Sequence, residues 1–365
     1  MTFYAPSATG LFFPGAGPLP GGAETQQLIL ARELARRGYR VAMVVLGEPG
    51  SLPTEQDGVR IVTQSVTRSR VPVIRSLLAL GKTIRCLLAA RAHTYVRRGL
   101  SAATGLLAAT AKLSRARFVF SSASALDFLP EKWEPDPRRV KVYEFGVRLA
   151  DEIVVQTAAQ ADLCQMRFNR QARVIRSIAE QSEARQGVPD AFLWIGRVEQ
   201  NKRPDAYLAL ARALPMAHFR MIALPSPTDT TGLADRLQRD AESIPNLELL
   251  HPRPRAELQE LYGSAAAIVS TSEYEGMPNV FLEAWARGVP ALSLTYDPDG
   301  LVAEEGLGAC ATGSFERFVE LADEIWGSRA NGAAVADRCR DYVAREHGVE
   351  ANVDRWIDVL GIRAG

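Results

Sequence analysis

Short apolar runs alternate with helical stretches from one end of this 365-residue chain to the other. The runs are too short for helices of ordinary length, which favours buried strands. Apolar residues at helical spacing fill intervals such as 24–38 and 204–214. Because strands separated by helices form parallel sheets through crossover connections, the pattern predicts an α/β fold. The predicted strands are 40–46, 59–62, 117–120, 152–155 and 173–175, and then 191–195, 219–224, 247–250, 267–270 and 291–294.

The pattern stops and restarts once, across a polar segment with Gly and Pro at 182–189 that is typical of a linker. We therefore predict two doubly wound, Rossmann-like domains, at 1–182 and 183–345. A C-terminal helix in 346–365 is expected to pack back on the first domain. Ligands of such domains bind at the carboxyl ends of the strands, so we expect the active site in a cleft between the two domains.

The segment before the first helix offers a phosphate-binding turn. Leu11-Phe-Phe13 is a candidate first strand, although Thr2-Phe-Tyr4 could also fill that role, and a Gly- and Pro-rich loop leads to Gly21-Gly22. Between a strand and a helix, the bare backbone N–H groups of two glycines can approach a phosphate closely. A turn without a ligand is the alternative.

The composition is that of an ordinary globular protein, with 47% hydrophobic and 23% charged residues. Prolines interrupt the uncharged residues 1–23, which predicts neither a signal peptide nor a membrane span. The four cysteines are scattered without a C-x-x-C pair, which favours free thiols in a reducing compartment. We therefore expect a cytoplasmic protein.

Charge is unevenly distributed despite a net charge of +1. No acidic residue lies between Asp57 and Asp127, and the basic residues there alternate with apolar runs, as in basic amphipathic helices that lie on an anionic membrane surface. A solvated basic face is the alternative. Because the block has few aromatic residues, nucleic acid is not expected as a partner. The block consists of Arg60, Arg68, Arg70, Arg75, Lys82, Arg85, Arg91, Arg97, Arg98, Lys112, Arg115 and Arg117.

Two carboxylates eight positions apart, Glu275 and Glu283, frame the start of a short helix predicted at 278–287. Pro278 suits a first turn, and Gly288 followed by Pro290 is a stop signal. The backbone N–H groups of residues 276–280 precede the helical hydrogen bonds and could bind a phosphate. Carboxylates on either side would accept hydrogen bonds from sugar hydroxyls, which favours a nucleotide sugar. Two solvated glutamates on a surface helix are the alternative.

Two cations, Arg197 and Lys202, lie in the loop that follows the predicted strand 191–195. Such a pair can hold a diphosphate and stabilise the charge that it gains as a leaving group. A plain surface loop is the alternative.

The order of these motifs, Gly-Gly-Ala-Glu-Thr-Gln26, Gly196-Arg-x4-Lys202 and Glu275-Gly-Met-Pro-Asn-Val-x-Leu-Glu-Ala-x-Ala-x-Gly-Val-Pro290, resembles family 4 of the retaining nucleotide-sugar glycosyltransferases, which have the GT-B fold. The likeness extends over nearly the whole chain. It implies that Arg197 and Lys202 bind the donor diphosphate. It also implies that Glu275 contacts the transferred sugar and Glu283 the ribose. The backbone of Gly276, Met277, Pro278, Asn279 and Val280 would support the phosphates or the sugar.

The resemblance further implies transfer with retention of anomeric configuration, by a front-face displacement in which the departing phosphate oxygen takes the acceptor proton. The chain departs from the family pattern in two places. The histidine that many relatives carry after a strand of the first domain is replaced within Phe118–Asp127, where Ser121 or Ser122 could take part of its role. A glycine-rich turn is replaced by Leu224-Pro-Ser-Pro227, which leaves the donor base open.

A rival motif, Asp297-Pro-Asp299-Gly, looks like the Asp-x-Asp of metal-dependent glycosyltransferases of another fold. Pro298 and Gly300 make a turn the simpler interpretation, so neither a metal nor another cofactor is expected. The sequence predicts a retaining, metal-independent, hexosyltransferase-type enzyme. Its acceptor would be lipid-linked or a polysaccharide, and it could lie peripherally on the inner face of the membrane. A nucleotide-sugar epimerase of the same fold and a non-catalytic sugar-nucleotide-binding subunit remain alternatives.

Overall fold

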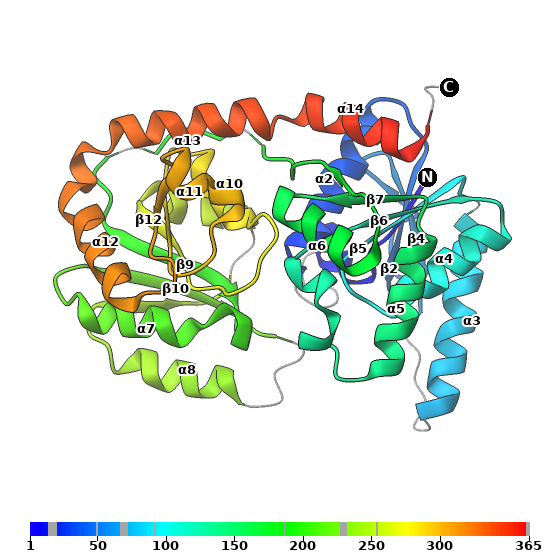
Figure 1. Ribbon diagram of the computed structural model, residues 1–365, viewed down its shortest axis with the longest axis horizontal. Helices are drawn as coiled ribbons and strands as arrows, with labels where there is room; N and C mark the ends of the chain where they lie inside the picture. The colour runs from blue at the N-terminus through cyan, green and yellow to red at the C-terminus, as the bar shows by residue number, and fades with distance from the viewer. Residues whose placement is uncertain are drawn as a thin grey trace. The chain divides into compact units, whose positions relative to one another are not determined.

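A computed structural model gives the structure of the chain and describes residues 1–13, 20–48, 50–65, 72–90, 92–180, 182–185, 187–226, 232–252 and 255–362 (Figure 1). The chain divides into two compact units, one of residues 1–178 with 349–365 and one of residues 179–348. The sequence predicted the linker at 182–189, slightly later than the division after residue 178 that the structure has. Arg185 in that segment already belongs to the second unit, because its backbone N–H donates to the Arg287 carbonyl over 3.0 Å.

The first unit contains an eight-stranded sheet in the order β3-β4-β2-β1-β5-β6-β7-β8. All neighbouring strands are parallel except β3 and β4. The chain passes from β1 outward through β2 to β4 and then returns to the other side of β1 with β5. The strands are β1 (Thr2–Tyr4), β2 (Val41–Leu46), β3 (Glu55–Gln56), β4 (Val59–Gln64), β5 (Thr94–Arg98), β6 (Arg117–Ser121), β7 (Glu152–Val155) and β8 (Arg173–Val174).

Helices cover both faces of this sheet, and alternate residues of the central strands feed two separate cores. Val96 and Val119 pack against α2 and α14, whereas Tyr95 and Phe118 pack against α3, α4 and α5. The predicted doubly wound arrangement is therefore confirmed for this unit. Its helices are α1 (Thr9–Phe12), α2 (Gly22–Arg36), α3 (Pro72–Ala90), α4 (Ala103–Leu113), α5 (Pro137–Leu149), α6 (Ala158–Phe168) and α14 (Val349–Leu360), with 3-10 turns η1 (Pro6–Ala8), η2 (Ala125–Phe128) and η3 (Pro130–Lys132).

The second unit contains six parallel strands in the order β11-β10-β9-β12-β13-β14. Helices again cover both faces, α7, α8 and α12 on one and α10 and α13 on the other. The strands are β9 (Ala191–Arg197), β10 (Phe219–Leu224), β11 (Leu247–Leu250), β12 (Ala265–Ser270), β13 (Ala291–Ser293) and β14 (Gly308–Cys310). The helices are α7 (Pro204–Ala213), α8 (Leu233–Glu242), α9 (Gln259–Gly263), α10 (Asn279–Trp285), α11 (Leu301–Glu304), α12 (Phe315–Ser328) and α13 (Ala333–Glu346), with 3-10 turns η4 (Gln200–Lys202), η5 (Arg255–Leu258), η6 (Pro298–Gly300) and η7 (Arg329–Asn331).

Most predicted strands are present, but the first one was assigned wrongly. Leu11 and Phe12 belong to helix α1, because Pro6 starts a helical turn and Thr9 anchors it by donating to the Leu46 carbonyl over 2.6 Å. Thr2–Tyr4, the second choice, is the central strand β1. The sequence also missed β5, whose two terminal arginines broke the apolar pattern. Strand β8 is a short exposed edge rather than the buried strand that was expected.

The basic block does not form one solvated face. Arg98 is buried, and Lys112 and Arg117 are paired with Asp151 and Glu152. Lys82 and Arg85 do lie on a helix, α3, as predicted. Several residues of the expected features lie outside the described part of the chain, namely Arg68, Arg70, Arg91, Gln186, Pro227 and the side chain of Arg75.

Two remaining observations concern membranes and thiols. In the part of the chain that the structure describes, every helix is too short or too polar to cross a bilayer. The four cysteines are all free thiols.

Candidate active site

The topology of the second sheet places two loops side by side. The strand order reverses between β9 and β12, and ligands of open α/β sheets bind at the carboxyl ends of the strands at such a switch point. The loop after β9 carries Arg197 and Lys202, and the loop after β12 carries Glu275. These two loops therefore lie where the fold itself favours a ligand.

Asn201 ties the two loops together. Its side-chain amide donates to the Tyr274 carbonyl over 3.0 Å and accepts from the Tyr274 N–H over 3.1 Å. Its own carbonyl accepts from the Glu273 N–H over 3.0 Å. This clamp could not be predicted from the sequence, because it joins residues that are 73 positions apart.

Lys202 and Glu275 form an ion pair between the two loops. The side chains are 25% and 15% exposed, so the pair is partly shielded from water and yet accessible. Arg197 is the last residue of β9 and is half-buried. The predicted cation loop and the predicted sugar-binding carboxylate are thus brought together, with Lys202 as the direct link.

The segment from Gly276 to Val280 leads into α10 as predicted, with a helix slightly shorter than 278–287. Pro278 is the residue that caps the helix, and the first helical donor is the Phe281 N–H, which bonds to the Pro278 carbonyl. The Tyr296 hydroxyl donates to the Gly276 carbonyl over 2.8 Å and fixes the turn. Beyond the helix, Gly288 adopts a φ of +77°, which suits a glycine and confirms the stop signal.

Glu283 is held in place by a tyrosine that the sequence analysis missed. The Tyr262 hydroxyl donates to a carboxylate oxygen of Glu283 over 2.7 Å. The guanidinium of Arg287 lies over the Tyr262 ring at 5.4 Å and donates to the Glu283 carbonyl. Glu283 is therefore only partly exposed and positioned, unlike a solvated glutamate on a surface helix.

Gly21 and Gly22 lie in the first unit, at the start of α2. The Gly21 N–H donates to the Glu24 carboxylate over 3.1 Å, so an internal anion occupies one of the backbone donors expected to bind phosphate. A role for these glycines in binding a ligand stays a prediction.

Ser122, a candidate for the role of the missing histidine, is buried within a polar network. Its hydroxyl lies 3.0 Å from a carboxylate oxygen of Asp127 and 3.1 Å from the Gln160 amide. Burial raises the pKa of Asp127, against the effect of hydrogen bonds from Ala123 and Ser124. The hydroxyl of Ser122 is thus engaged by the fold, whereas Ser121 lines a cavity described below.

Asp297, of the rival Asp-x-Asp motif, caps a helix. Its two carboxylate oxygens accept from the N–H groups of Val302 and Ala303, over 2.8 and 3.1 Å, at the start of α11. Pro298–Gly300 forms the turn η6 that precedes the helix. The motif therefore has a structural role.

Two larger cavities lie beside the sheets, one at the carboxyl ends of strands in the second unit and one at the amino ends of strands in the first unit. One of about 490 Å³ lies between α8 and the ends of β9, β10 and β11, with mostly apolar lining that includes Val198, Pro225 and His251. The other, of about 620 Å³, lies at the amino ends of strands in the first unit, beside Met1 and Arg40. Since ligands of such sheets bind at the carboxyl ends of the strands, the cavity of about 490 Å³ beside α8 is the better candidate for a ligand site.

Two family models match most of the chain. The model described as a glycosyl transferase 4-like domain matches residues 21–177, and the model described as glycosyl transferases group 1 matches residues 186–326. The chain belongs to the family 4 glycosyltransferases, which have the GT-B fold. The resemblance inferred from the sequence motifs is thereby confirmed.

Similar proteins include D-inositol 3-phosphate glycosyltransferase of Frankia alni, 27% identical over 239 residues, which are 60% of this chain and 53% of that protein. The match thus spans about half the length of this curated relative. Sucrose-phosphate synthase of Thermosynechococcus elongatus shares the fold with a TM-score of 0.79, 15% identity and coverage of 98% of this chain and 97% of that one. Anabaena HepE, solved with UDP and glucose, gives a TM-score of 0.77, 13% identity and coverage of 99% of both chains.

Proposed function

We propose that this member of the glycosyltransferase family moves a sugar, with retention of anomeric configuration, from a nucleoside diphosphate to a lipid-linked or polysaccharide acceptor. The observation that carries the proposal is the ion pair of Lys202 and Glu275 at the switch point of the second sheet. A cation suited to phosphate and a carboxylate suited to sugar hydroxyls lie in direct contact there.

The ion pair would exchange partners when a donor binds. The diphosphate would draw the Lys202 ammonium away from Glu275, and Arg197 at the end of β9 would supply a second positive charge. Glu275 would then accept hydrogen bonds from hydroxyls of the transferred sugar. As the bond to the anomeric carbon breaks, the diphosphate gains negative charge, and cations fixed beforehand stabilise that state more than the bound substrate.

The cavity beside α8 is suited to the nucleoside base. Val198 directly follows Arg197, so a diphosphate at Arg197 would place the nucleoside near this lining. Its largely apolar surface fits a flat ring, with few polar groups to fix orientation. HepE, which shares the fold, was solved with UDP, so UDP-sugars are the first donors to test.

Transfer is proposed to need no metal. The positive charge that a metal would bring to the diphosphate is available from Arg197 and Lys202. Both oxygens of Asp297 already accept hydrogen bonds from backbone N–H groups, which leaves that carboxylate poorly placed to act as a metal ligand.

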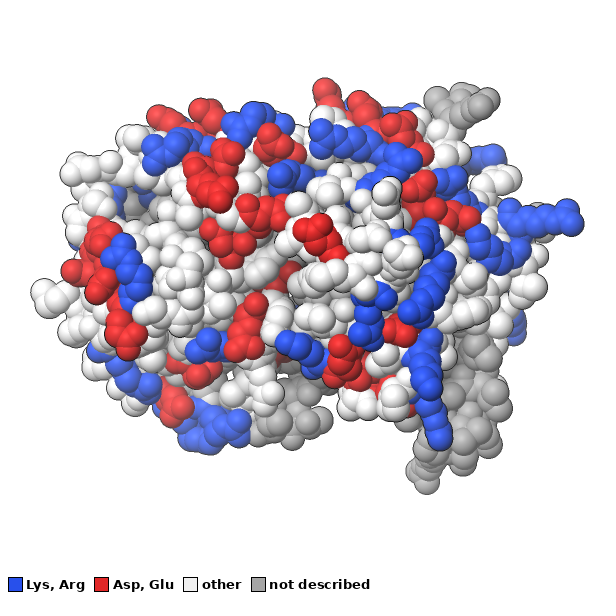
Figure 2. Space-filling model, in the orientation of Figure 1, with Lys and Arg blue, Asp and Glu red and all other residues white. Residues whose placement is uncertain are grey.

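A peripheral location on an anionic, cytoplasmic membrane surface is part of the proposal. Leu78 and Leu88 of α3 are 48% and 51% exposed, and Arg85 lies with them on one side of the helix. In the face drawn in Figure 2, Lys and Arg side chains gather over the part of the first unit that α5 occupies in Figure 1. Exposed leucines beside basic residues are typical of surfaces that bind anionic lipids.

Two other functions are open to test. A nucleotide-sugar epimerase would convert the donor without a second substrate, and a non-catalytic subunit would bind it unchanged. Incubation of the protein with a nucleotide sugar alone, followed by chromatography, separates the three. A transferase slowly releases free nucleoside diphosphate through hydrolysis, whereas an epimerase yields a new nucleotide sugar and a binding subunit yields neither. Formation of an epimer would overturn the proposed function.

A further inference from the structure

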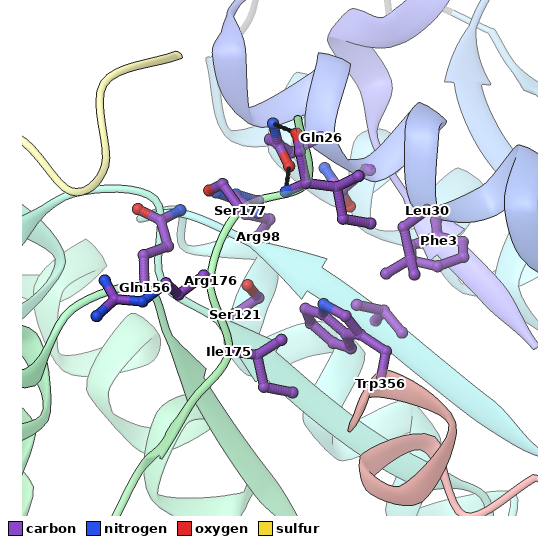
Figure 3. Close-up of a pocket in the computed structure, with 13 residues that line it drawn as sticks. Phe3, Gln26, Leu30, Arg98, Ser121, Gln156, Ile175, Arg176, Ser177 and Trp356 are labelled. Atoms are coloured by element: carbon purple, nitrogen blue, oxygen red, sulfur yellow. Dashed lines mark hydrogen bonds between the residues drawn. The ribbon is translucent and has the colours of Figure 1, made fainter. Parts of the chain in front are cut away.

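The sheet of the first unit has a switch point of its own, between β1 and β5. Arg98 is the last residue of β5 and faces the same side of the sheet as Val96, toward α2. A narrow cavity lies there, walled by α2, by the segment 175–178 and by Trp356 of α14 (Figure 3). Its free space is about 10 Å³, which admits one water-sized group and excludes a sugar ring.

The charged residues that line this cavity are basic. Two arginines, Arg98 and Arg176, are among its lining residues, and no Asp or Glu is among those that the structure describes. Arg98 is 9% exposed, and within the described ranges its guanidinium makes neither a hydrogen bond nor an ion pair. Burial lowers the pKa of Arg98 to about 10, so the side chain still carries its charge at neutral pH. The carboxylates of Asp127 and Glu24 attract this charge only from a distance, without an ion pair, so the pKa of Arg98 is still lowered. A buried guanidinium that lacks hydrogen bonds is costly to the folded protein, which favours an anion beside it.

Gln27 adds a second polar group without a partner. It is 3% exposed, and neither its amide nitrogen nor its oxygen finds a hydrogen bond among the described residues. The neighbouring Gln26 is fully engaged, because its side chain donates to the Ile178 carbonyl and accepts from the Ile178 N–H, each over 2.8 Å. Gln26 thus secures the wall of the cavity, while Gln27 brings to the same cavity as Arg98 an amide N–H donor that no described residue accepts.

Arg97 provides an internal comparison. It precedes Arg98 in β5 and faces the opposite side of the sheet, where it donates to the Tyr4 carbonyl over 3.3 Å and lies over the Tyr4 ring at 5.7 Å. Its charge is thus used to hold β1 against β5. Arg98 has no such structural contact, although both residues lie at the carboxyl end of β5.

We infer that the cavity of Arg98 and Gln27 binds one terminal oxygen of an anionic group, a carboxylate or a phosphate, that the acceptor carries. The guanidinium and the amide supply donors for an oxyanion, and the apolar walls of Val96, Ile175 and Trp356 keep water out and strengthen the contact. The assignment to the acceptor rests on the proposed function, in which the cations of the second unit hold the donor phosphates. The chemistry of the site does not depend on that assignment.

The test is thermal melting of the protein in inorganic phosphate or acetate, at constant ionic strength set with sodium chloride. Because phosphate can also bind at the donor site, the comparison is made in the Lys202→Ala background, with and without Arg98→Gln. Phosphate should raise the melting temperature of Lys202→Ala, and Arg98→Gln should weaken the apparent affinity at least about tenfold. Gln27→Leu should also weaken it, whereas Arg138→Gln, on the exposed face of α5, should leave it unchanged.

The same series separates a binding role from a structural one. Without added anion, Arg98→Gln should melt no lower than its parent, since it removes a buried charge for which the cost of burial outweighs the attraction of Asp127 and Glu24. A lower melting temperature would make Arg98 a structural residue. An anion response that persists with Arg98→Gln, or that is already absent in Lys202→Ala, would equally overturn the inference. Because no turnover is measured, failure here would leave the proposed transfer activity standing.

Discussion

The ammonium of Lys202 and the carboxylate of Glu275 meet across two loops that follow adjacent strands, β9 and β12, of the second sheet. Each residue neutralises the other while no donor is bound. The pairing keeps both side chains in place and avoids leaving a partly buried charge without a partner. A diphosphate can then replace the carboxylate at Lys202 without requiring the loops to move.

The Asn201 clamp should prove essential to this arrangement. Asn201→Ala removes two hydrogen bonds to the backbone of Tyr274, which should lower the free energy of unfolding by about 1–3 kcal/mol and weaken donor binding. Denaturant unfolding and donor titration measure the two effects. Gln200→Ala, at the exposed neighbouring position, is the control and should change neither. An Asn201 variant that binds donor normally would show that the loops are held by other contacts.

Tyr262→Phe tests the proposed role of Glu283. The change removes only the hydroxyl that orients the Glu283 carboxylate. If Glu283 anchors the ribose, KM for the donor should rise about three- to tenfold while kcat stays nearly constant, because the lost contact is equal in the bound substrate and the transition state. Steady-state kinetics with varied donor provide the measurement. A fall in kcat at constant KM would instead place Glu283 in the chemical step.

Metal independence predicts full activity in excess EDTA. Asp297→Asn should also keep the activity, and should lower stability by about 1 kcal/mol, since the amide has only one oxygen for the N–H groups of Val302 and Ala303. Initial rates before and after EDTA treatment are the measurement. Loss of activity that Mn²⁺ restores would contradict this prediction.

Membrane association predicts binding to anionic vesicles, weaker at high salt, and little binding to neutral ones. Replacing both Leu78 and Leu88 by Ser should reduce the bound fraction in vesicle sedimentation. Leu113→Ser is a matched control, because this leucine is 88% exposed but belongs to α4 rather than α3. Equal binding to both kinds of vesicle, or an equal effect of the control, would exclude α3 as the membrane surface.

The sequence predicted the parts of this molecule that depend on local pattern. Unbroken apolar runs such as 41–46 gave most strands, and the spacing of Glu275 and Glu283 around a helix start gave the candidate site. Strand β5 was missed because Arg97 and Arg98 look like solvated residues when their neighbours in the sheet are unknown. For the same reason Arg98 was taken for part of a basic surface.

Contacts between distant segments could not be predicted. Asn201 and Tyr274 are 73 positions apart, and Tyr262 lies 21 positions before Glu283. A polar side chain that satisfies backbone groups elsewhere in the fold leaves no periodic signal in a single sequence. The ion pair of Lys202 with Glu275 belongs to the same class, although both residues were selected separately.

The central claim is that Lys202 and Glu275 bind the donor and promote its cleavage. Two measurements together test it most directly: calorimetric binding of a nucleoside diphosphate, and the rate at which that diphosphate is released from the nucleotide sugar. UDP, GDP, ADP and dTDP are first ranked by thermal shift, and the tightest is used. Lys202→Met should weaken binding about 10- to 100-fold. Glu275→Gln should bind the diphosphate as well as or better than the unaltered protein, because Lys202 loses its competing partner, while release from the sugar falls about tenfold or more. Binding and release in both variants that match the control Glu273→Gln would contradict the account.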